Sequence, residues 1–376
     1  MDTQNLYVAV DPGFDSMKVV ANGKAFKFPF NVVETDERKM TDYRLRDDFM
    51  LYQGREGTTY RVGQYARELV YDNKEKVDTF YTEQRFISDE FKVGLDTAIA
   101  LAIEKNGFYE KQADLNIHIM VALPHACRTT FSPTIIGSTA GKHWFRLRCG
   151  NGKFRTYTFT IQEGQVHMLS QTIAAILGET SNDTGMLNAE KFFYLSDGPT
   201  LVLDGGYYTM GMVVVSRGGS VDEAKTESNT QFAMANVNQC VADAVKDKRP
   251  DISHYAVEYL IHTDNCTLRY MNGEKAETLD LKVLREEKMK EVCSELIDYL
   301  NRKYNHLLDF KYVLVTGGTG AMFYPQILHY YSSANLLDKE HLLLTSCELG
   351  SGSLPIEYAI AIGSYKGLLG VVNTTK

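Results

Sequence analysis

Two short segments far apart in this chain share one design, an apolar run that ends in aspartate and is followed closely by glycine. Residues 8–11 lead through Pro12 to Gly13, and residues 201–204 lead directly to Gly205 and Gly206. Each pattern predicts a buried strand that ends in a tight turn, because glycine lets a backbone turn sharply and approach a ligand. After the first turn the chain returns as a strand that carries Lys18. Two such turns favour two related halves that bind one nucleotide.

Length and charge narrow the class of protein. The chain has 376 residues, which is long for one domain and comfortable for two. Its net charge is -8, with acidic and basic residues interspersed. Direct binding to nucleic acid normally needs a clustered basic face, so this balance argues against it. Binding to DNA through an adaptor protein stays open.

Cysteine usage and hydropathy bear on the cellular compartment of the chain and on whether it crosses a membrane. None of the six cysteines forms a Cys-x-x-Cys pair, so zinc binding and dithiol redox chemistry have no support. Reduced thiols in a cytoplasmic protein are the expectation. The first residues are not basic and show no secretory signal. No apolar run approaches the roughly 20 residues that cross a bilayer, so no membrane segment is expected.

Alternating strand and helix patterns predict an α/β protein. Strands are predicted at residues 115–123, 201–204, 210–216 and 312–316, and helices at 91–105, 166–177, 286–308 and 354–369. Residues 142–162 are predicted to form a hairpin. Its turn is placed at residues 149–153, where Asn151-Gly152 accepts the positive φ of a tight hairpin.

The first turn combines a carboxylate, a glycine and a lysine. Asp11 can hold water on a divalent cation, and Lys18 can neutralise phosphate oxygens. Gly13 lets backbone amides approach a phosphate with no side chain in the way. A simple hairpin with a charged rim is the alternative. The candidate nucleotide-binding residues of this turn are Asp11, Gly13, Phe14, Asp15, Ser16 and Lys18.

Two more glycine-rich turns follow predicted strands. In the first, Asp204 precedes Gly205, Gly206 and Tyr207, an arrangement that can cradle phosphate. In the second, residues 312–316 lead into a turn that opens a helix and suits close packing against a purine or ribose. That turn consists of Gly317, Gly318, Thr319 and Gly320. Either turn, taken alone, can be purely structural.

Glu163 is the candidate for water activation. It lies between a predicted strand and the helix predicted to start at Val166. A carboxylate there can polarise a water molecule for attack on a terminal phosphate. The alternative is an acidic residue in an ordinary first helical turn, which the helix dipole favours.

In order and spacing, these segments resemble the actin-like ATPase superfamily, and more narrowly the plasmid- and phage-borne bacterial proteins of the ParM/StbA type. Asp11, Gly13 and Lys18 fit the first phosphate loop, and Leu123-Pro124 fits a strand end of the family. Glu163 matches the acidic catalytic position. Residues 204–206, 317–320 and 356–367 match the second phosphate loop, the adenosine motif and the connecting helix. The chain departs at Tyr207-Tyr208, where the family usually has small hydroxyl residues.

The resemblance implies an α/β, actin-like fold of two related domains around a nucleotide cleft. Domain I would comprise residues 1–196 with a return over 346–376, and domain II residues 197–345. ATP, or GTP, would bind with Mg²⁺ and drive the assembly of identical subunits into a filament, which hydrolysis loosens. Asp11 and Asp204 would order water around Mg²⁺. A DNA-binding adaptor protein would connect the filament to plasmid or phage DNA.

Two other functions stay open. The first is a small-molecule kinase of the same superfold, such as a sugar or acetate kinase, for which no catalytic base is apparent in the sequence. The second is a nucleotide-binding scaffold with little turnover. It stays open because Tyr207-Tyr208 stand where the family usually has small hydroxyl residues.

Overall fold

The computed structural model describes residues 4–36, 48–67, 83–191, 197–262 and 266–374. The chain divides into two compact units, Met1–Phe192 with Ser346–Lys376 (unit 1) and Phe193–Thr345 (unit 2). The predicted domain boundary after residue 196 lies at the edge of an undescribed segment, since residues 192–196 are outside the described residues.

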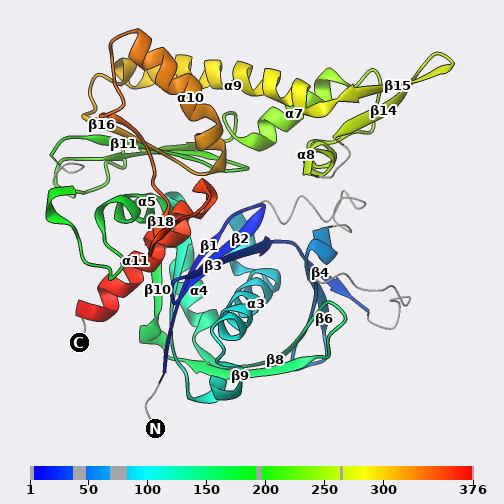
Figure 1. Cartoon of the computed structure of the whole chain (residues 1–376), viewed down its shortest axis with the longest axis vertical. Coiled ribbons are helices and arrows are strands. Elements are labelled where there is room, and N and C mark those ends of the chain that lie inside the picture. Colours follow the sequence, from blue (N-terminus) through cyan, green and yellow to red (C-terminus); the bar gives the residue numbers. More distant parts are fainter. Residues whose placement is uncertain (1–3, 37–47, 68–82, 192–196, 263–265, 375–376) are drawn as a thin grey trace. The chain divides into compact units, whose positions relative to one another are not determined.

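The main sheet of unit 1 has the strand order β10-β7-β1-β2-β3 (Figure 1). Strands β1, β7 and β10 are parallel to one another, whereas β2 is antiparallel to both β1 and β3. The strands are β1 (Asn5–Pro12), β2 (Ser16–Ala21), β3 (Lys24–Pro29), β7 (Asn116–Leu123) and β10 (Val166–Ser170). The predicted hairpin over residues 8–20 and the strand over 115–123 are therefore confirmed.

The main sheet of unit 2 repeats this plan. Its strand order is β13-β12-β11-β16-β17, in which β11, β16 and β17 are parallel and β12 is antiparallel to both β11 and β13. The strands are β11 (Thr200–Gly205), β12 (Met210–Val215), β13 (Glu227–Asn229), β16 (Tyr312–Thr316) and β17 (Leu342–Leu344). The two sheets thus correspond strand for strand, with β1 matching β11 and β7 matching β16.

Smaller elements complete each unit. Unit 1 has a second sheet, ordered β4-β6-β5-β8-β9, and unit 2 has the hairpin β14-β15. The unit 1 strands are β4 (Val32–Thr35), β5 (Phe49–Gln53), β6 (Thr59–Gly63), β8 (Gly141–Cys149), β9 (Arg155–Ile161), β18 (Glu348–Leu349) and β19 (Gly352–Ser353); those of unit 2 are β14 (Thr267–Asn272) and β15 (Lys275–Asp280).

Helices account for much of the remaining chain. Unit 1 contains η2 (Glu83–Ile87), α3 (Asp89–Lys105), η3 (Tyr109–Asp114), α4 (His125–Thr139), η4 (Glu163–Gln165), α5 (Gln171–Thr180), η6 (Ile356–Tyr358) and α11 (Ala359–Thr374). Unit 2 contains α7 (Met234–Ala244), α8 (His254–His262), α9 (Leu281–Lys303), η5 (Asn305–Leu307) and α10 (Gly318–Ser333). Among the helices in the described ranges, none is long and apolar enough to cross a bilayer.

The central strands are buried on both faces, as expected for parallel strands covered by helices. In β1, Leu6, Val8 and Val10 belong to the large core on one face of the sheet. Ala9, on the other face, packs in a separate cluster with α11 residues such as Ala361 and Ile362. Successive side chains of a strand point to opposite faces, which explains this division.

The prediction of one helix over residues 166–177 is wrong. Val166–Ser170 is the strand β10, paired in parallel with β7 from Ile119 to Leu123, and only Gln171–Thr180 is helical. A short apolar run does not distinguish a buried strand from a helix by periodicity. Pairing with β7 therefore decides its conformation.

Two predicted helices and one predicted turn also differ from the structure. Helix α9 covers Leu281–Lys303 rather than 286–308, because Asp280 caps its start and Asn305, His306 and Leu307 have positive φ. The last helix is split into η6 and α11, after Pro355. In the β8–β9 turn the positive φ falls at Gly150, not at Asn151-Gly152.

Candidate functional site

The first predicted turn joins β1 to β2 in unit 1. Asp11 is 4% exposed, and the residue paired with it across the hairpin is Lys18. The Lys18 Nζ lies 3.3 Å from Asp11 Oδ2, and Gln171 Nε2 donates to Asp11 Oδ1 at 2.9 Å. Both oxygens of this buried carboxylate therefore have a polar partner, one cationic and one neutral.

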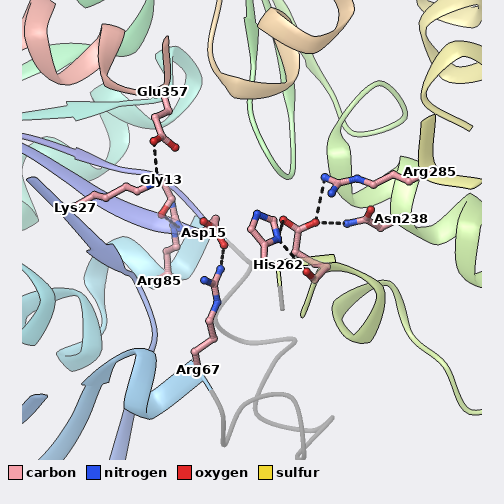
Figure 2. Close-up of polar contacts among 10 residues, drawn as sticks. Gly13, Asp15, Lys27, Arg67, Arg85, Asn238, His262, Arg285 and Glu357 are labelled. Carbon is pink, nitrogen blue, oxygen red and sulfur yellow. Dashed lines mark hydrogen bonds and ion pairs between the residues drawn. The ribbon is translucent and has the colours of Figure 1, made fainter. Parts of the chain in front are cut away.

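The backbone of this turn is closely packed. The Gly13 N–H donates to Asp11 O at 3.0 Å, and a Cβ built on Gly13 would lie 2.5 Å from Lys18 Nζ. A side chain at position 13 would therefore displace the lysine. Asp15, in the same turn, forms an ion pair with Arg67 (Figure 2), and its carbonyl accepts from Phe30 N at 3.0 Å.

Gln171 is a residue that the sequence interpretation missed. It is the first residue of α5 and directly follows β10, so it lies at the carboxyl edge of the sheet beside Asp11. Its neighbour Ser170 is 1% exposed, and its hydroxyl has no hydrogen-bond partner among the described residues. The local signal is a strand that ends in Ser-Gln before an apolar helix. A single helix over residues 166–177 leaves no strand end at this position.

Glu163 lies at the other edge of the same sheet. It is exposed and belongs to η4, which precedes β10 instead of opening a helix. The neighbouring Gln165 donates to the side chain of Asn116, the first residue of β7. With a rise of about 3.3 Å per residue, β10 alone separates the two edges by about 13 Å. The structure therefore does not bring Glu163 to Asp11.

The second turn, in unit 2, is built from backbone packing. Asp204 pairs with Gly211 across the β11–β12 hairpin. A Cβ on Gly205 would lie 2.2 Å from the backbone nitrogen of Gly320, so β11 and the start of α10 meet without side chains. Gly317 has φ +78° and lies against Gly205 O and Asp204 Oδ1, where any other residue would be strained.

The third turn is confirmed as the opening of a helix. Gly318, Thr319 and Gly320 form the first turn of α10, whose N-terminal amides and dipole favour anions or polar ligand atoms. Thr319 Oγ1 donates to Gly206 O at 2.7 Å, which ties this turn to the second one. Thr316, at the end of β16, is fully buried, and its hydroxyl has no hydrogen-bond partner in the described part of the chain.

Tyr207 and Tyr208 are held by unit 2 itself. The ring of Tyr207 packs against the main core of unit 2, and its carbonyl accepts from Ala235 N at 2.7 Å. The hydroxyl of Tyr208 lies 2.7 Å from that of Tyr255. These contacts fix the segment after Gly206, where the Thr209 carbonyl accepts from Gly206 N at 2.8 Å.

The residues present fit a magnesium nucleotide. Each unit has one aspartate at the carboxyl end of its central strand. Each also has a buried hydroxyl with no hydrogen-bond partner among the described residues: Thr316 is paired with Asp204, and Ser170 precedes Gln171, which donates to Asp11. Carboxylates, hydroxyls and water are the oxygen donors that Mg²⁺ prefers. The glycine turns add backbone amides for phosphate.

Two sheets with one strand order, each with an aspartate turn at the same place, define an α/β protein of the actin-like fold. Comparison with solved structures agrees with this class. No family model matches the chain, and no curated protein matches it in sequence.

Three similar structures cover almost the whole chain. A 15-stranded ParM filament from Clostridium botulinum has 16% identity and a TM-score of 0.68, covering 97% of this chain and 99% of its own. The actin-like protein Alp7A has 14% identity and a TM-score of 0.69, covering 99% and 98%. ParM from Bacillus thuringiensis with ADP has 14% identity and a TM-score of 0.60, covering 99% of both chains. At these identities the likeness establishes the fold.

Proposed function

We propose that this chain is a nucleotide-dependent, filament-forming ATPase of the ParM type, with units 1 and 2 as actin-like domains I and II. One observation carries the proposal: the same hairpin occurs in both units, with Asp11 paired to Lys18 and Asp204 paired to Gly211. A duplicated aspartate turn suits a ligand that both units bind. Its chemistry, two carboxylates, one lysine and backbone amides, suits Mg-ATP.

In this proposal the side chains have distinct tasks. Asp11 and Asp204 hold the water ligands of Mg²⁺, which supplies positive charge to the phosphates. Lys18 binds phosphate oxygens, together with the amides of the residue 13–16 turn and of Gly205-Gly206. Residues 317–320 bind the nucleoside.

Gln171, rather than Glu163, orients the attacking water in this proposal. Its amide already donates to Asp11, at the edge of the sheet where the phosphate loop lies. An amide can both donate to and accept from water, so it can direct a water molecule without taking its proton permanently.

The similar structures support the proposal that this chain assembles. The similar structures include a filament and an ADP complex, both of ParM proteins. We propose that ATP binding favours a polymer of identical subunits and that hydrolysis loosens it. The chain has a net charge of -8, which disfavours direct binding to DNA. We therefore propose that a DNA-binding adaptor attaches plasmid or phage DNA to the filament.

The test is assembly measured with its nucleotide controls. Light scattering and negative-stain imaging should show filaments with ATP and Mg²⁺, and fewer or none with ADP, with GTP as the alternative substrate. Phosphate release should accompany assembly. Asp204→Ala should weaken nucleotide binding or turnover. A wild-type protein that binds nucleotide but never assembles would contradict the proposal.

The same assays separate the two alternatives. A small-molecule kinase would transfer phosphate to an added sugar or acetate and would show no nucleotide-dependent scattering. A scaffold with little turnover would assemble without phosphate release. Duplex DNA should not bind the purified chain at about 0.15 M salt, where charges are screened over about 8 Å. Tight, salt-sensitive DNA binding would remove the need for an adaptor.

A further inference from the structure

Arg85 places a buried guanidinium group behind the first turn. The residue is 2% exposed and lies on η2, 72 residues from Gly13 in the sequence. Its Nη2 donates to Pro12 O at 2.7 Å, and its Nη1 donates to Gly13 O at 3.3 Å. Figure 2 shows the side chain directed at the turn near Gly13. One side chain therefore binds two successive carbonyls of the proposed phosphate loop.

Aromatic rings hold the guanidinium in place. Its carbon lies 3.7 Å from the ring centre of Phe14 and 4.7 Å from that of Phe86. A planar, delocalised cation can stack on rings while its edge donates two hydrogen bonds, and lysine cannot do both. The arrangement is therefore specific for arginine.

The backbone of Arg85 is fixed as well. Its carbonyl accepts from the hydroxyl of Ser88 at 2.8 Å and from the Ser88 N–H at 3.1 Å. Ser88 in turn caps helix α3, where it accepts from Phe91 N at 3.1 Å. The turn is thus connected to the start of a long buried helix through Arg85.

Two carbonyls held in this way determine where the next amides point. A trans peptide group is planar, with its C=O and N–H directed to opposite sides. When Arg85 binds Gly13 O, the Phe14 N–H has to point away from the guanidinium. The same holds for Pro12 O and the Gly13 N–H, which donates to Asp11 O at 3.0 Å. Arg85 also adds a fixed positive charge behind these amides, which favours an anion on their far side.

We propose that Arg85 is a positioning residue for nucleotide binding: it acts through the backbone of Pro12 and Gly13 and holds the turn in the conformation that receives the phosphates, without touching the nucleotide. This inference rests on the proposed function. It predicts that geometry, and not charge alone, determines the contribution of Arg85. Lysine at this position keeps the charge and loses the paired hydrogen bonds and the stacking.

The experiment compares Arg85→Lys with a matched control, Arg146→Lys. Arg146 stacks on Phe154 at 4.8 Å and donates to Gln53 at 2.9 Å in the second sheet of unit 1, so it has similar contacts away from the turn. Affinity for ATP is measured by calorimetry below the unfolding temperature of each variant. Arg85→Lys should bind ATP about 10- to 100-fold more weakly, the value of one or two charge-assisted hydrogen bonds. Arg146→Lys should bind like the wild type.

A double-variant cycle with Phe14→Leu supplies the readout that a purely structural role would not give. Phe14→Leu removes the nearer of the two stacking rings, so it should weaken ATP binding through the same loop. If both act on loop geometry, the double variant should lose less affinity than the product of the single losses. Independent, multiplicative losses would overturn the inference. Should Arg85→Lys fail to fold, Phe14→Leu alone decides, and unchanged affinity in it would overturn the inference.

The inference and the proposed function fail in different ways. If wild-type protein binds no nucleotide, the proposed function is wrong and the inference falls with it. If the wild type binds ATP and Arg85→Lys binds it equally well, only the positioning role is wrong.

Discussion

The turns at Asp11 and Asp204 have the same hairpin register and are stabilised in opposite ways. Asp11 is paired with Lys18, and Asp204 with Gly211, seven positions later in both cases. In unit 1 side chains hold the turn: Lys18 comes from the same hairpin, and Gln171, Arg67 and Arg85 come from distant segments. In unit 2 the turn is held mainly by main chain, since Gly205 and Gly317 pack against neighbouring backbone, with one side-chain hydrogen bond from Thr319 Oγ1 to Gly206 O.

This difference assigns separate roles to the two turns. The side chains that hold the unit 1 turn have rotatable bonds, so they can change their interactions as a phosphate arrives or leaves. A backbone cradle in unit 2 has no such freedom and keeps one shape, because close-packed main chain has few alternatives. We therefore expect chemistry to depend on unit 1 side chains, and the fold of unit 2 to depend on its glycines.

The largest expected effect concerns Gln171, to which the proposed function assigns the positioning of the attacking water. Gln171→Ala should lower phosphate release by about 10²-fold or more, the usual value of a group that positions or activates a reacting water. Nucleotide affinity should change much less, because Lys18 and the backbone amides remain. Single-turnover phosphate release and ATP calorimetry measure the two quantities.

Glu163→Ala is the matched control for Gln171→Ala. Glu163 is exposed at the opposite edge of the sheet, so its removal should leave both turnover and affinity at wild-type values. A large loss of turnover in Glu163→Ala with none in Gln171→Ala would restore the acidic residue as the water-positioning group. It would also show that η4 moves when nucleotide binds.

The next effect tests the backbone cradle of unit 2. Gly205→Ala forces a Cβ to 2.2 Å from the Gly320 nitrogen, and overpacking of this kind costs about 1–3 kcal/mol or more. Gly13→Ala in unit 1 meets the end of the Lys18 side chain at 2.5 Å and the Ser16 carbonyl at 3.0 Å, so it should cost less than Gly205→Ala, because a side chain can shift where backbone cannot. Urea unfolding of both variants measures the difference. Equal destabilisation would break the contrast between the two turns.

The positions of the three turns can be predicted from the sequence, because each depends on a local pattern. The strands that end at Asp11, Asp204 and Thr316 are apolar runs closed by glycine, and β1, β11 and β16 confirm them. Glycine reports a backbone requirement at its own position, so the three turns could be located without any tertiary information.

The long-range contacts that Arg85 and Gln171 make with the first turn cannot be predicted from local sequence patterns. Arg85 lies 72 residues from Gly13, and Gln171 lies 160 residues from Asp11. No local pattern places either residue beside the turn, because only the parallel pairing of β10 with β7 and the packing of η2 bring them there. Because Val166–Ser170 is a strand and not the start of a helix, Glu163 and Gln171 lie at opposite ends of β10.

A smaller effect contrasts the buried ion pairs of the two units. In unit 1, His143 Nδ1 lies 2.8 Å from Asp96, and its Nε2 lies 2.9 Å from the Thr139 carbonyl, so acceptors flank both ring nitrogens. Burial lowers the pKa of His143, but the hydrogen bond and charge of Asp96 outweigh it, and the net pKa is raised. In unit 2 the buried carboxylate of Glu258 is paired with Arg285, which does not titrate, and with the more exposed His262, each at 3.3 Å.

The stability of unit 1 should therefore fall as pH rises. A raised folded-state pKa contributes stability that is complete below the unfolded value, about 6.5, and is lost as pH passes through the folded value. The single tryptophan, Trp144, adjoins His143 in β8 and reports on unit 1. Urea unfolding followed by its fluorescence should show a decline with pH that His143→Gln reduces. An identical pH dependence in the variant would rule out His143 as the cause.

The smallest expected effect concerns the buried hydroxyls of Ser170 and Thr316, one in each unit. Neither has a hydrogen-bond partner among the described residues, so Ser170→Ala and Thr316→Val should leave stability unchanged or raise it by about 1 kcal/mol. If these hydroxyls serve the bound nucleotide or its metal-bound water, affinity for Mg-ATP should fall about 2- to 10-fold, the worth of one hydrogen bond. Calorimetry with and without nucleotide separates the two outcomes.

The two variants also test the contrast between the turns. Thr316 pairs with Asp204 in the unit 2 sheet, whereas Ser170 precedes Gln171 beside the turn that side chains hold. Thr316→Val should therefore cost more affinity than Ser170→Ala. The reverse order would mean that the backbone cradle is the more adaptable of the two turns.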